Sequence, residues 1–214
     1  MYIKNQLCYY KMFFDIGANI GNWSLSNVFN SKQIIAIEPV PKTFNILTNN
    51  TSNELKIICL NYAVCNSDNK YINLCDCEIN TLSTLNKDWL ESPNSRFYNY
   101  KYNTIICKTI SIDKLIQYYG VPELIKIDVE GGEFECITSL TQKVNNICFE
   151  WASETNNITF KCLDYLQNLG FNEFSIQFDD NYLYRPSSYT NINNIKQLLN
   201  KTTPKIDWGM IWTK

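Results

Sequence analysis

The sequence predicts an α/β fold, a doubly wound and mostly parallel sheet of seven strands with helices on both faces. Two observations support this. Short apolar runs alternate with amphipathic segments along the 214-residue chain, which is typical of a parallel sheet covered by helices. A turn containing two glycines follows the first apolar run, as expected where a strand leads into a helix. The length suits one well-buried core, so we expect a single domain over residues 1–214.

The apolar runs give the expected order of the elements. Strands are predicted at 12–17, 33–39, 56–64, 123–129, 146–151, 173–178 and 208–214. Helices are expected between them at 22–29, 41–50, 132–140 and 158–170. Pro41 suits the first turn of the second helix, and Gly170 suits the end of the last. Two inserts, 71–112 and 179–205, interrupt the alternation, and we expect them to form the substrate side of the site because long loops in compact domains are commonly functional.

Composition limits the partners and the compartment. The formal charge is −2 and the pI is near 5.3, so no basic field favours nucleic acid or an anionic membrane surface. No apolar run is long enough to span a membrane, and the first residues lack the apolar core of a signal peptide. We therefore expect a cytoplasmic protein.

The nine cysteines lie mostly in apolar runs, which indicates buried thiols in a reducing compartment. Cys75 and Cys77 form the one close pair, and they lie in a strand-like alternation. There is no histidine to complete a mixed zinc site. We expect no structural zinc.

The turn after the first strand, in "DIGANIG", predicts a ligand-binding loop. Gly17 and Gly21 let the backbone turn sharply and approach a ligand without a clashing Cβ. Asn19 stands where dinucleotide-binding loops carry a third glycine, and asparagine tolerates left-handed geometry better than other non-glycine residues. The turn should therefore be intact.

The acids around this loop indicate the charge of the ligand. Asp15 precedes Gly17 by two residues, and its carboxylate would repel a pyrophosphate but suit a cationic ligand. Glu38 ends the second strand, where an acid typically accepts hydrogen bonds from both ribose hydroxyls. S-adenosylmethionine meets both conditions, because its sulfonium and α-ammonium are positive and it has no phosphates. An ordinary strand-turn-helix with a surface glutamate remains the alternative.

The sequence resembles the FkbM-type S-adenosylmethionine-dependent methyltransferases. The resemblance spans about 12–151 and lies in "FFDIGANIGNWSL", "IAIEPVPKTFNIL", "NYAV", "LIKIDVEGGEFECI" and the glutamate of "ICFEW". It implies a class I methyltransferase (Rossmann-like) fold and methylation of a hydroxyl on a sugar or secondary-metabolite scaffold. The last third of the chain matches only in its rhythm of strands and helices, so the resemblance does not identify the acceptor.

The segment "KIDVEGGE" is the candidate catalytic segment. The strand period of two places Lys126, Asp128 and Glu130 on one side of the extended chain. Methyl transfer from a sulfonium requires an aligned acceptor oxygen and a group that takes its proton. With no histidine in the chain, we expect the base among Asp128, Glu130 and Glu150, the last of which ends the neighbouring strand. A solvated surface with Lys126 paired to an acid is the alternative.

Other assignments stay open. Asp128 and Glu150 could hold Mg²⁺ instead, which we consider possible but do not favour. Asn61 and Ala63 are expected to border the adenine, although asparagine at a strand end is as often a turn former. The segment "STL" at 83–85 could close over the ligand. Aromatic residues of the inserts could stack on a sugar ring or simply pack the loops; they are Trp89, Phe97, Tyr98, Tyr100, Tyr102, Tyr182, Tyr184 and Tyr189, with Arg185 beside them.

The sequence therefore predicts an S-adenosylmethionine-dependent O-methyltransferase acting on a sugar, a glycan or a glycosylated metabolite. Methylation of another small molecule, a protein or an RNA is an alternative within the same class. A cofactor-binding fold that has lost catalysis and serves as a scaffold is an alternative from a different class. The acids at Asp15, Glu38, Asp128, Glu130 and Glu150 argue against the last.

Overall fold

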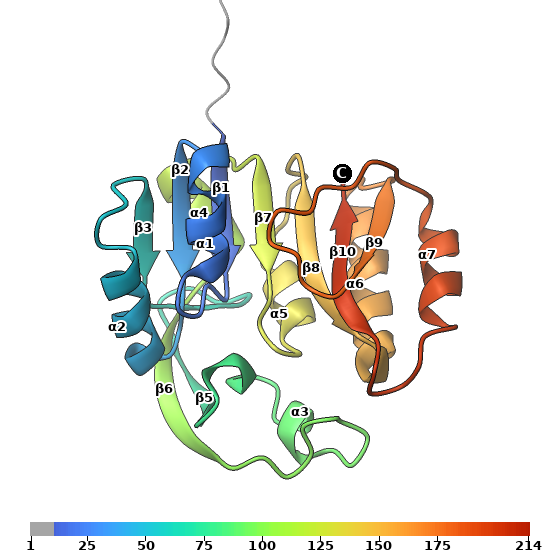
Figure 1. Cartoon of the computed structure of the whole chain (residues 1–214), viewed down its shortest axis with the longest axis horizontal. Coiled ribbons are helices and arrows are strands. Elements are labelled where there is room, and N and C mark those ends of the chain that lie inside the picture. The colour runs from blue at the N-terminus through green and yellow to red at the C-terminus, as the bar shows by residue number, and fades with distance from the viewer. Residues whose placement is uncertain (1–10) are drawn as a thin grey trace, which may run out of the picture.

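The computed structural model describes residues 11–214, and its main feature is a seven-stranded sheet (Figure 1). The strands lie in the order β3-β2-β1-β7-β8-β10-β9. Neighbouring strands are parallel from β3 to β8, whereas β10 runs antiparallel to β8 and β9. Their bounds are β1 (Met12–Ile16), β2 (Gln33–Ile37), β3 (Ile57–Leu60), β7 (Leu124–Ile127), β8 (Ile147–Ala152), β9 (Phe174–Phe178) and β10 (Trp208–Thr213). Chain order reverses between β1 and β7, which is where open α/β sheets bind ligands.

Helices cover both faces of the sheet, which confirms the predicted fold class. Because side chains alternate along a strand, Phe14 and Ile16 face one core cluster and Phe13 faces another. The first face packs against α4 (Ile112–Tyr119), α5 (Glu133–Ile137), α6 (Asn156–Asn168) and α7 (Ile192–Leu199). The second face packs against α1 (Asn22–Asn27) and α2 (Pro41–Asn50).

A second, smaller sheet lies beyond the carboxyl ends of the parallel strands, at the bottom of Figure 1. It consists of β4 (Ala63–Val64), β6 (Tyr102–Ile110) and β5 (Tyr71–Cys77), in that order. Between β5 and β6 the chain forms a 3-10 turn at Asn80–Leu82 and the short helix α3 (Asp88–Glu91). We call residues 71–110 the cap. The first insert of the sequence therefore folds largely as two strands joined by a loop.

The segment after β9 covers the second face of the sheet where no helix does. Residues 179–190, which we call the crossing segment, pass in front of β8 and β10 (Figure 1). Asn27 of α1 donates from Nδ2 to the carbonyl of Tyr182 at 3.1 Å, and Arg185 Nη2 donates to Asn27 Oδ1 at 2.6 Å. Tyr182 and Tyr184 pack with the apolar cluster on this face. These contacts fix the crossing segment against α1.

Two predicted strands end earlier than expected, and two helices were not predicted. The strand expected at 56–64 ends at Leu60, because the Asn61 side chain donates to the carbonyls of Glu38 and Pro39 and turns the chain into β4. The strand expected at 123–129 ends at Ile127. The helices that were not predicted are α4, which begins where the first insert ends, and α7, which lies within the second insert. Both are amphipathic, and they are capped by Ser111 and Asn191.

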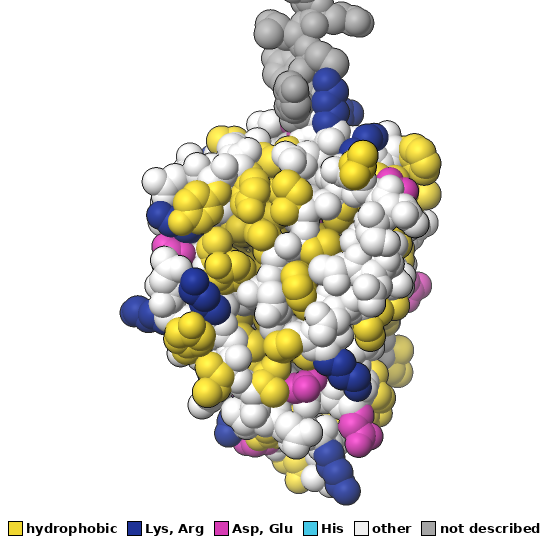
Figure 2. Space-filling model, turned by 90° about the vertical axis from the view of Figure 1, so that its left-hand side faces the viewer, with side chains coloured by type: hydrophobic (Ala, Val, Ile, Leu, Met, Phe, Trp, Pro, Cys, Tyr) yellow, Lys and Arg dark blue, Asp and Glu magenta, His cyan; other side chains and the backbone are white. Residues whose placement is uncertain are grey.

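The free edge of the sheet is β3, which faces the viewer in Figure 2. Hydrophobic side chains gather on this side of the molecule, and all four β3 residues are partly exposed. Within residues 11–214, β3 pairs with β2 alone.

The cysteines in the described part of the chain are unpaired thiols, and all of them except Cys59 are buried, as expected. No helix in this part is long and apolar enough to cross a membrane. Residues 1–10, in which we expect no signal peptide, lie outside the described residues.

Candidate active site

A cavity of about 620 Å³ opens at the carboxyl ends of β1, β2, β7 and β8, between the sheet and the cap. Its walls come from the loop after β1, the ends of β2 and β7, and Glu150 of β8. The cap and the crossing segment close it on the outside. Its volume lies in the range of small-molecule sites. The sheet therefore places the predicted motifs around one cavity.

The glycine loop has the tight geometry expected from its sequence. Gly17 has φ 73°, and a Cβ there would lie 1.7 Å from the carbonyl oxygen of Asp128, so this position requires glycine. Asn19 adopts the left-handed conformation with φ 49°. Its side chain accepts a hydrogen bond from Asn80 of the cap at 2.8 Å. Gly21 begins α1 with φ 95° and does not line the cavity.

Asp15 lies beneath the cavity rather than in its wall. The side chain is fully buried, and Ser24 Oγ donates to its Oδ2 at 2.6 Å. Its Oδ1 lies 3.3 Å from the ammonium of Lys126. The positive charge that faces Asp15 in this structure is therefore a lysine of the same chain, and its carboxylate supports the loop from below.

Lys126 is a buried ammonium held among oxygen atoms. Its Nζ donates to the carbonyl of Gly17 at 3.0 Å and lies 3.3 Å from Asp128 Oδ2 and from Asp15 Oδ1. Burial alone would lower the pKa of Lys126, but the two carboxylates outweigh it and raise the pKa above its usual value. Lys126 therefore stays protonated, and it acts as a fixed charge rather than as a base.

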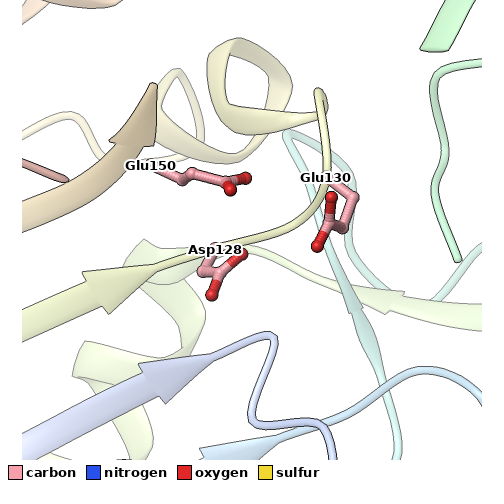
Figure 3. Close-up of side chains that lie close together, drawn as sticks. All are labelled: Asp128, Glu130 and Glu150. Atoms are coloured by element: carbon pink, nitrogen blue, oxygen red, sulfur yellow. The ribbon is translucent and has the colours of Figure 1, made fainter. Parts of the chain in front are cut away.

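Asp128, Glu130 and Glu150 form a cluster that we call the acidic triad (Figure 3). Their carboxylates point toward one another, and oxygen atoms of all three lie within 4.8 Å of one another. Burial and the neighbouring carboxylates raise the pKa of Glu130 and of Glu150 well above the usual value for glutamate. The triad can thus bind and release a proton at a pH far above that of an ordinary carboxyl.

The turn after β7, rather than strand periodicity, brings Glu130 into the triad. Glu130 has φ 55°, and Thr84 of the cap donates to its carbonyl at 2.6 Å. Glu133 accepts hydrogen bonds from the backbone of Gly131 at 3.1 Å and Val129 at 3.3 Å. The predicted functional end of this strand is therefore a hydrogen-bonded turn that the cap supports.

Glu38 lies at the other end of the cavity. Its two oxygens accept hydrogen bonds from the backbone of Asn19 at 3.0 Å and of Val40 at 2.9 Å. Burial raises its pKa to about 7. Ala63 lines the cavity nearby, whereas Asn61 does not, because its side chain bonds the backbone of the turn. Asn61 therefore forms a turn, which was the alternative to its expected place beside the adenine.

Half of the predicted aromatic residues line the cavity. Trp89, Phe97, Tyr100 and Tyr182 line the cavity, as do Ser83, Thr84 and Leu85. Four of the predicted residues do not line it, namely Tyr98, Tyr102, Tyr184 and Tyr189. Arg185 lies over the ring of Trp212, 5.3 Å from its centre, and is part of the packing.

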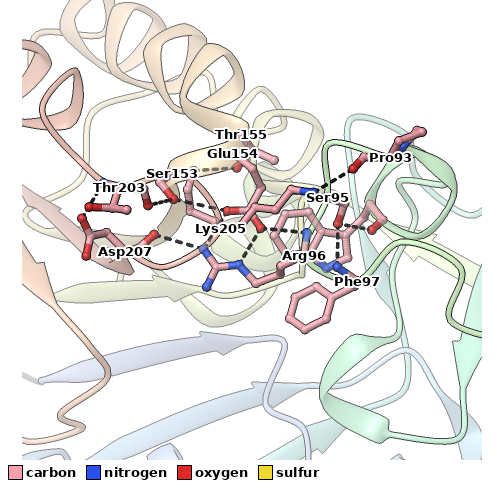
Figure 4. Close-up of polar contacts among 12 residues, drawn as sticks. Pro93, Ser95, Arg96, Phe97, Ser153, Glu154, Thr155, Thr203, Lys205 and Asp207 are labelled. Carbon is pink, nitrogen blue, oxygen red and sulfur yellow. Dashed lines mark hydrogen bonds and ion pairs between the residues drawn. The ribbon is translucent and has the colours of Figure 1, made fainter.

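Two charged residues of the cavity wall were not predicted from the sequence. Asp180 of the crossing segment lines the cavity, and so does Arg96 of the cap. Arg96 bonds both oxygens of Glu154 (Figure 4). Asp180 could have been predicted from the pair "DD" directly after the sixth predicted strand, because acids at the ends of other strands of this chain were correctly expected near the cavity. No local sequence pattern pointed to Arg96, since its partner Glu154 is 58 residues away.

The sheet order and the cavity define a class of protein. A Rossmann order with an antiparallel strand inserted before the last, together with an acid at the end of β2 and a glycine turn after β1, is the arrangement of the class I methyltransferases. Residues 15–173 match the methyltransferase FkbM domain. The chain belongs to the FkbM methyltransferase family, which confirms the predicted resemblance.

Individual relatives are more distant. The chain is 28% identical over 142 residues to the hexuronic acid methyltransferase AglP of Haloferax volcanii, a match that covers 63% of this chain and 52% of that protein. The chain thus spans about half the length of this curated relative.

Among solved structures, a precorrin 8W decarboxylase of Methanobacterium thermoautotrophicum matches with a TM-score of 0.49 and 10% identity, over 95% of this chain and 81% of that one. A precorrin-6y C5,15-methyltransferase of Geobacter metallireducens matches with a TM-score of 0.47 and 11% identity, over 95% and 80%. Because both scores are below 0.5, the family assignment depends on the sequence match.

Proposed function

We propose that the protein is an S-adenosylmethionine-dependent O-methyltransferase that acts on a hydroxyl of a sugar, a glycan or a glycosylated metabolite. The observation that supports this best is the acidic triad, which lies in the same cavity as Glu38 and the glycine loop. A cofactor acid and candidate bases thus line one space of suitable volume.

The cavity residues fit the proposed cofactor. Glu38 has two oxygens that each accept one backbone hydrogen bond, which leaves further lone pairs for the two ribose hydroxyls. Tyr62 and Ala63 offer apolar wall beside it for an adenine. Glu38, the triad and Asp180 make the cavity rich in carboxylates. A ligand with a sulfonium and an ammonium suits that charge, and a pyrophosphate does not.

The chemistry requires one proton acceptor. As the acceptor oxygen forms its bond to the methyl carbon, the bond from that carbon to sulfur breaks, and the hydroxyl proton passes to a carboxylate. The raised pKa of Glu150 and of Glu130 makes either of them, when ionised, a stronger proton acceptor than an ordinary carboxylate. Lys126 holds Asp128 in place at 3.3 Å.

A neutral hydroxyl suits the cavity better than an anionic acceptor group. The relative AglP is a hexuronic acid methyltransferase, and a hexuronic acid carries a carboxylate. A further carboxylate beside the three of the acidic triad would be repelled unless a cation lay between them. Trp89, Phe97 and Tyr100 of the cap provide aromatic wall, and such rings commonly stack on sugars. We therefore place the acceptor between the triad and the cap.

The test is transfer of a radiolabelled methyl group from S-adenosylmethionine to a panel of neutral glycosides and uronic acids. The neutral glycosides should be the better acceptors. Asp128→Asn and Glu150→Gln should lower kcat by about 100-fold or more, because each removes a carboxylate of the triad that receives the transferred proton. Their affinity for S-adenosylhomocysteine, measured by calorimetry, should change by only a few-fold.

Glu135→Gln is the matched control, because Glu135 is an exposed glutamate on α5, and it should behave as wild type. Full turnover in both triad variants would show that neither Asp128 nor Glu150 is the base. Binding of NAD with no binding of S-adenosylhomocysteine would overturn the cofactor assignment.

A divalent cation at the triad is a second candidate for the same site. The observation in its favour is that three carboxylates offer oxygen ligands within 4.8 Å of one another. Such an ion would orient the acceptor hydroxyl and lower its pKa. We favour the metal-free base, so turnover should survive dialysis against a chelator. Loss of turnover that Mg²⁺ restores would assign the triad to the metal instead.

A further inference from the structure

The crossing segment brings a carboxylate to the cavity from outside the family domain. Asp180 lies seven positions beyond residue 173, where the match to the FkbM domain ends. It lines the cavity with Asn22, Trp23 and Tyr182 on the side of α1. The bonds of Asn27 to Tyr182 and Arg185 hold this part of the crossing segment against α1. Asp180 is thus presented to the cavity by a fixed backbone.

Asp180, unlike Glu38 and Asp128, has no close partner for its charge. Glu38 accepts two backbone hydrogen bonds, and Asp128 lies 3.3 Å from Lys126. Within residues 11–214, the Asp180 carboxylate takes part in no hydrogen bond and in no ion pair within 4.0 Å, and the charge of Lys126 acts on it from farther away. A partly buried carboxylate of this kind favours a cationic ligand.

The position of Asp180 relative to Glu38 indicates which part of the ligand it faces. Glu38 and Ala63 mark the ribose and adenine end, on the β2 side of the glycine loop. Asp180 lies on the other side of that loop, where Lys126 and the first residues of α1 also line the cavity. A nucleoside held at Glu38 therefore extends its amino-acid end toward Asp180.

We infer that Asp180 receives the α-ammonium of the methyl donor and thereby selects a nucleoside with an amino-acid end. This inference rests on the proposed function, since it names a contact of the same cofactor. Asp180 acts as a binding residue that does not touch the transferred methyl group. The family domain supplies the ribose contact, and the crossing segment supplies the contact to the ammonium.

Calorimetry with two ligands tests the inference directly. S-adenosylhomocysteine and its deamino analogue differ only in the amino group that Asp180 is proposed to bind. Wild type should prefer S-adenosylhomocysteine by about 10-fold or more, as expected for a hydrogen bond between charged groups. Asp180→Asn should remove most of that preference while binding the deamino analogue as wild type does. Asp180→Glu, which keeps the charge, should retain part of it.

Asp179→Asn is the matched control, because Asp179 is the exposed neighbour and does not line the cavity. It should keep the full preference. Equal weakening of both ligands by Asp180→Asn, or an unchanged preference, would overturn the role of Asp180 while leaving the proposed function intact. Wild type that binds neither ligand would overturn the proposed function and this inference with it.

Discussion

Asn19 occupies a backbone position that most residues avoid. Its φ of 49° lies in the left-handed region, and its amide donates to Glu38 while its side chain accepts from Asn80. A left-handed conformation costs L-residues about 1–2 kcal/mol, less for asparagine and glycine and more for β-branched residues. Asn19 therefore connects the glycine loop to Glu38 and to the cap at little conformational cost.

This geometry predicts opposite outcomes for two substitutions at Asn19. Asn19→Gly should leave the free energy of unfolding within about 1 kcal/mol of wild type, because glycine accepts this φ. Asn19→Val should destabilise the protein by about 2 kcal/mol and weaken S-adenosylhomocysteine binding, because a β-branched residue would move the loop away from Glu38. Denaturant unfolding and calorimetry measure both effects. Equal stability of the two variants would contradict the proposed role of the backbone conformation.

At the scale of elements, the cap is joined to the turn that follows β8 by a partly buried ion pair. Arg96 donates from Nε and Nη2 to the two oxygens of Glu154, at 2.5 and 2.6 Å, and also to the carbonyl of Asp207 (Figure 4). Burial would raise the pKa of Glu154, but the hydrogen bonds from Arg96 outweigh this and lower it. Lys205 adds a bond to the carbonyl of Pro93. These contacts hold the cap over the cavity.

Removing Arg96 should therefore loosen the cap. Arg96→Ala removes the guanidinium from a Glu154 side chain that is only 3% exposed and leaves it the weaker bonds from Ser153 and the backbone of residue 96, so we expect a loss of about 3 kcal/mol in the free energy of unfolding. Faster proteolytic cleavage within residues 92–101 should accompany the loss. The matched control is Lys196→Ala, which breaks the exposed ion pair with Asp164 and should cost about 0.5 kcal/mol or less. Similar losses in both variants would show that the Arg96 pair does not fasten the cap.

The elements also show what local sequence encodes. Alternating apolar runs predicted the main strands, because burial on both faces of a parallel sheet leaves a continuous apolar pattern. Glu38, the residues of the triad and the glycine loop were predicted because they lie at or near the ends of predicted strands. The path of the crossing segment could not be predicted, since it depends on a bond from Asn27 to Tyr182 across 155 residues. Helices α4 and α7 have capping residues that can be recognised in the sequence, Ser111 and Asn191. They were not predicted because they lie in or beside the long inserts, which were treated as loops.

At the scale of the whole molecule, folding brings many carboxylates together at one end of the sheet. Their burial there makes the ionised form unfavourable. Burial raises the pKa of Glu38 and of Glu133 to about 7 and that of Asp180 to about 6. A net charge of −2 thus conceals a local excess of carboxylates around the cavity. A cationic ligand would relieve this excess, which links cofactor binding to the stability of the fold.

This charge predicts how the stability of the ligand-free protein depends on pH. A carboxyl whose pKa is raised in the folded state binds more protons folded than unfolded between about pH 4.5 and 7, so the free energy of unfolding falls as the pH rises through that window. For Glu38 the shift from 4.5 to about 7 corresponds to at most ~3 kcal/mol. Lys126 does not oppose the trend, because its pKa is raised above a usual value that already lies far above this window. Denaturant unfolding from pH 5 to 8 should show the decline, and Glu38→Gln should make it shallower. Stability that rises over this range would mean that these carboxylates are ionised and paired in the folded protein.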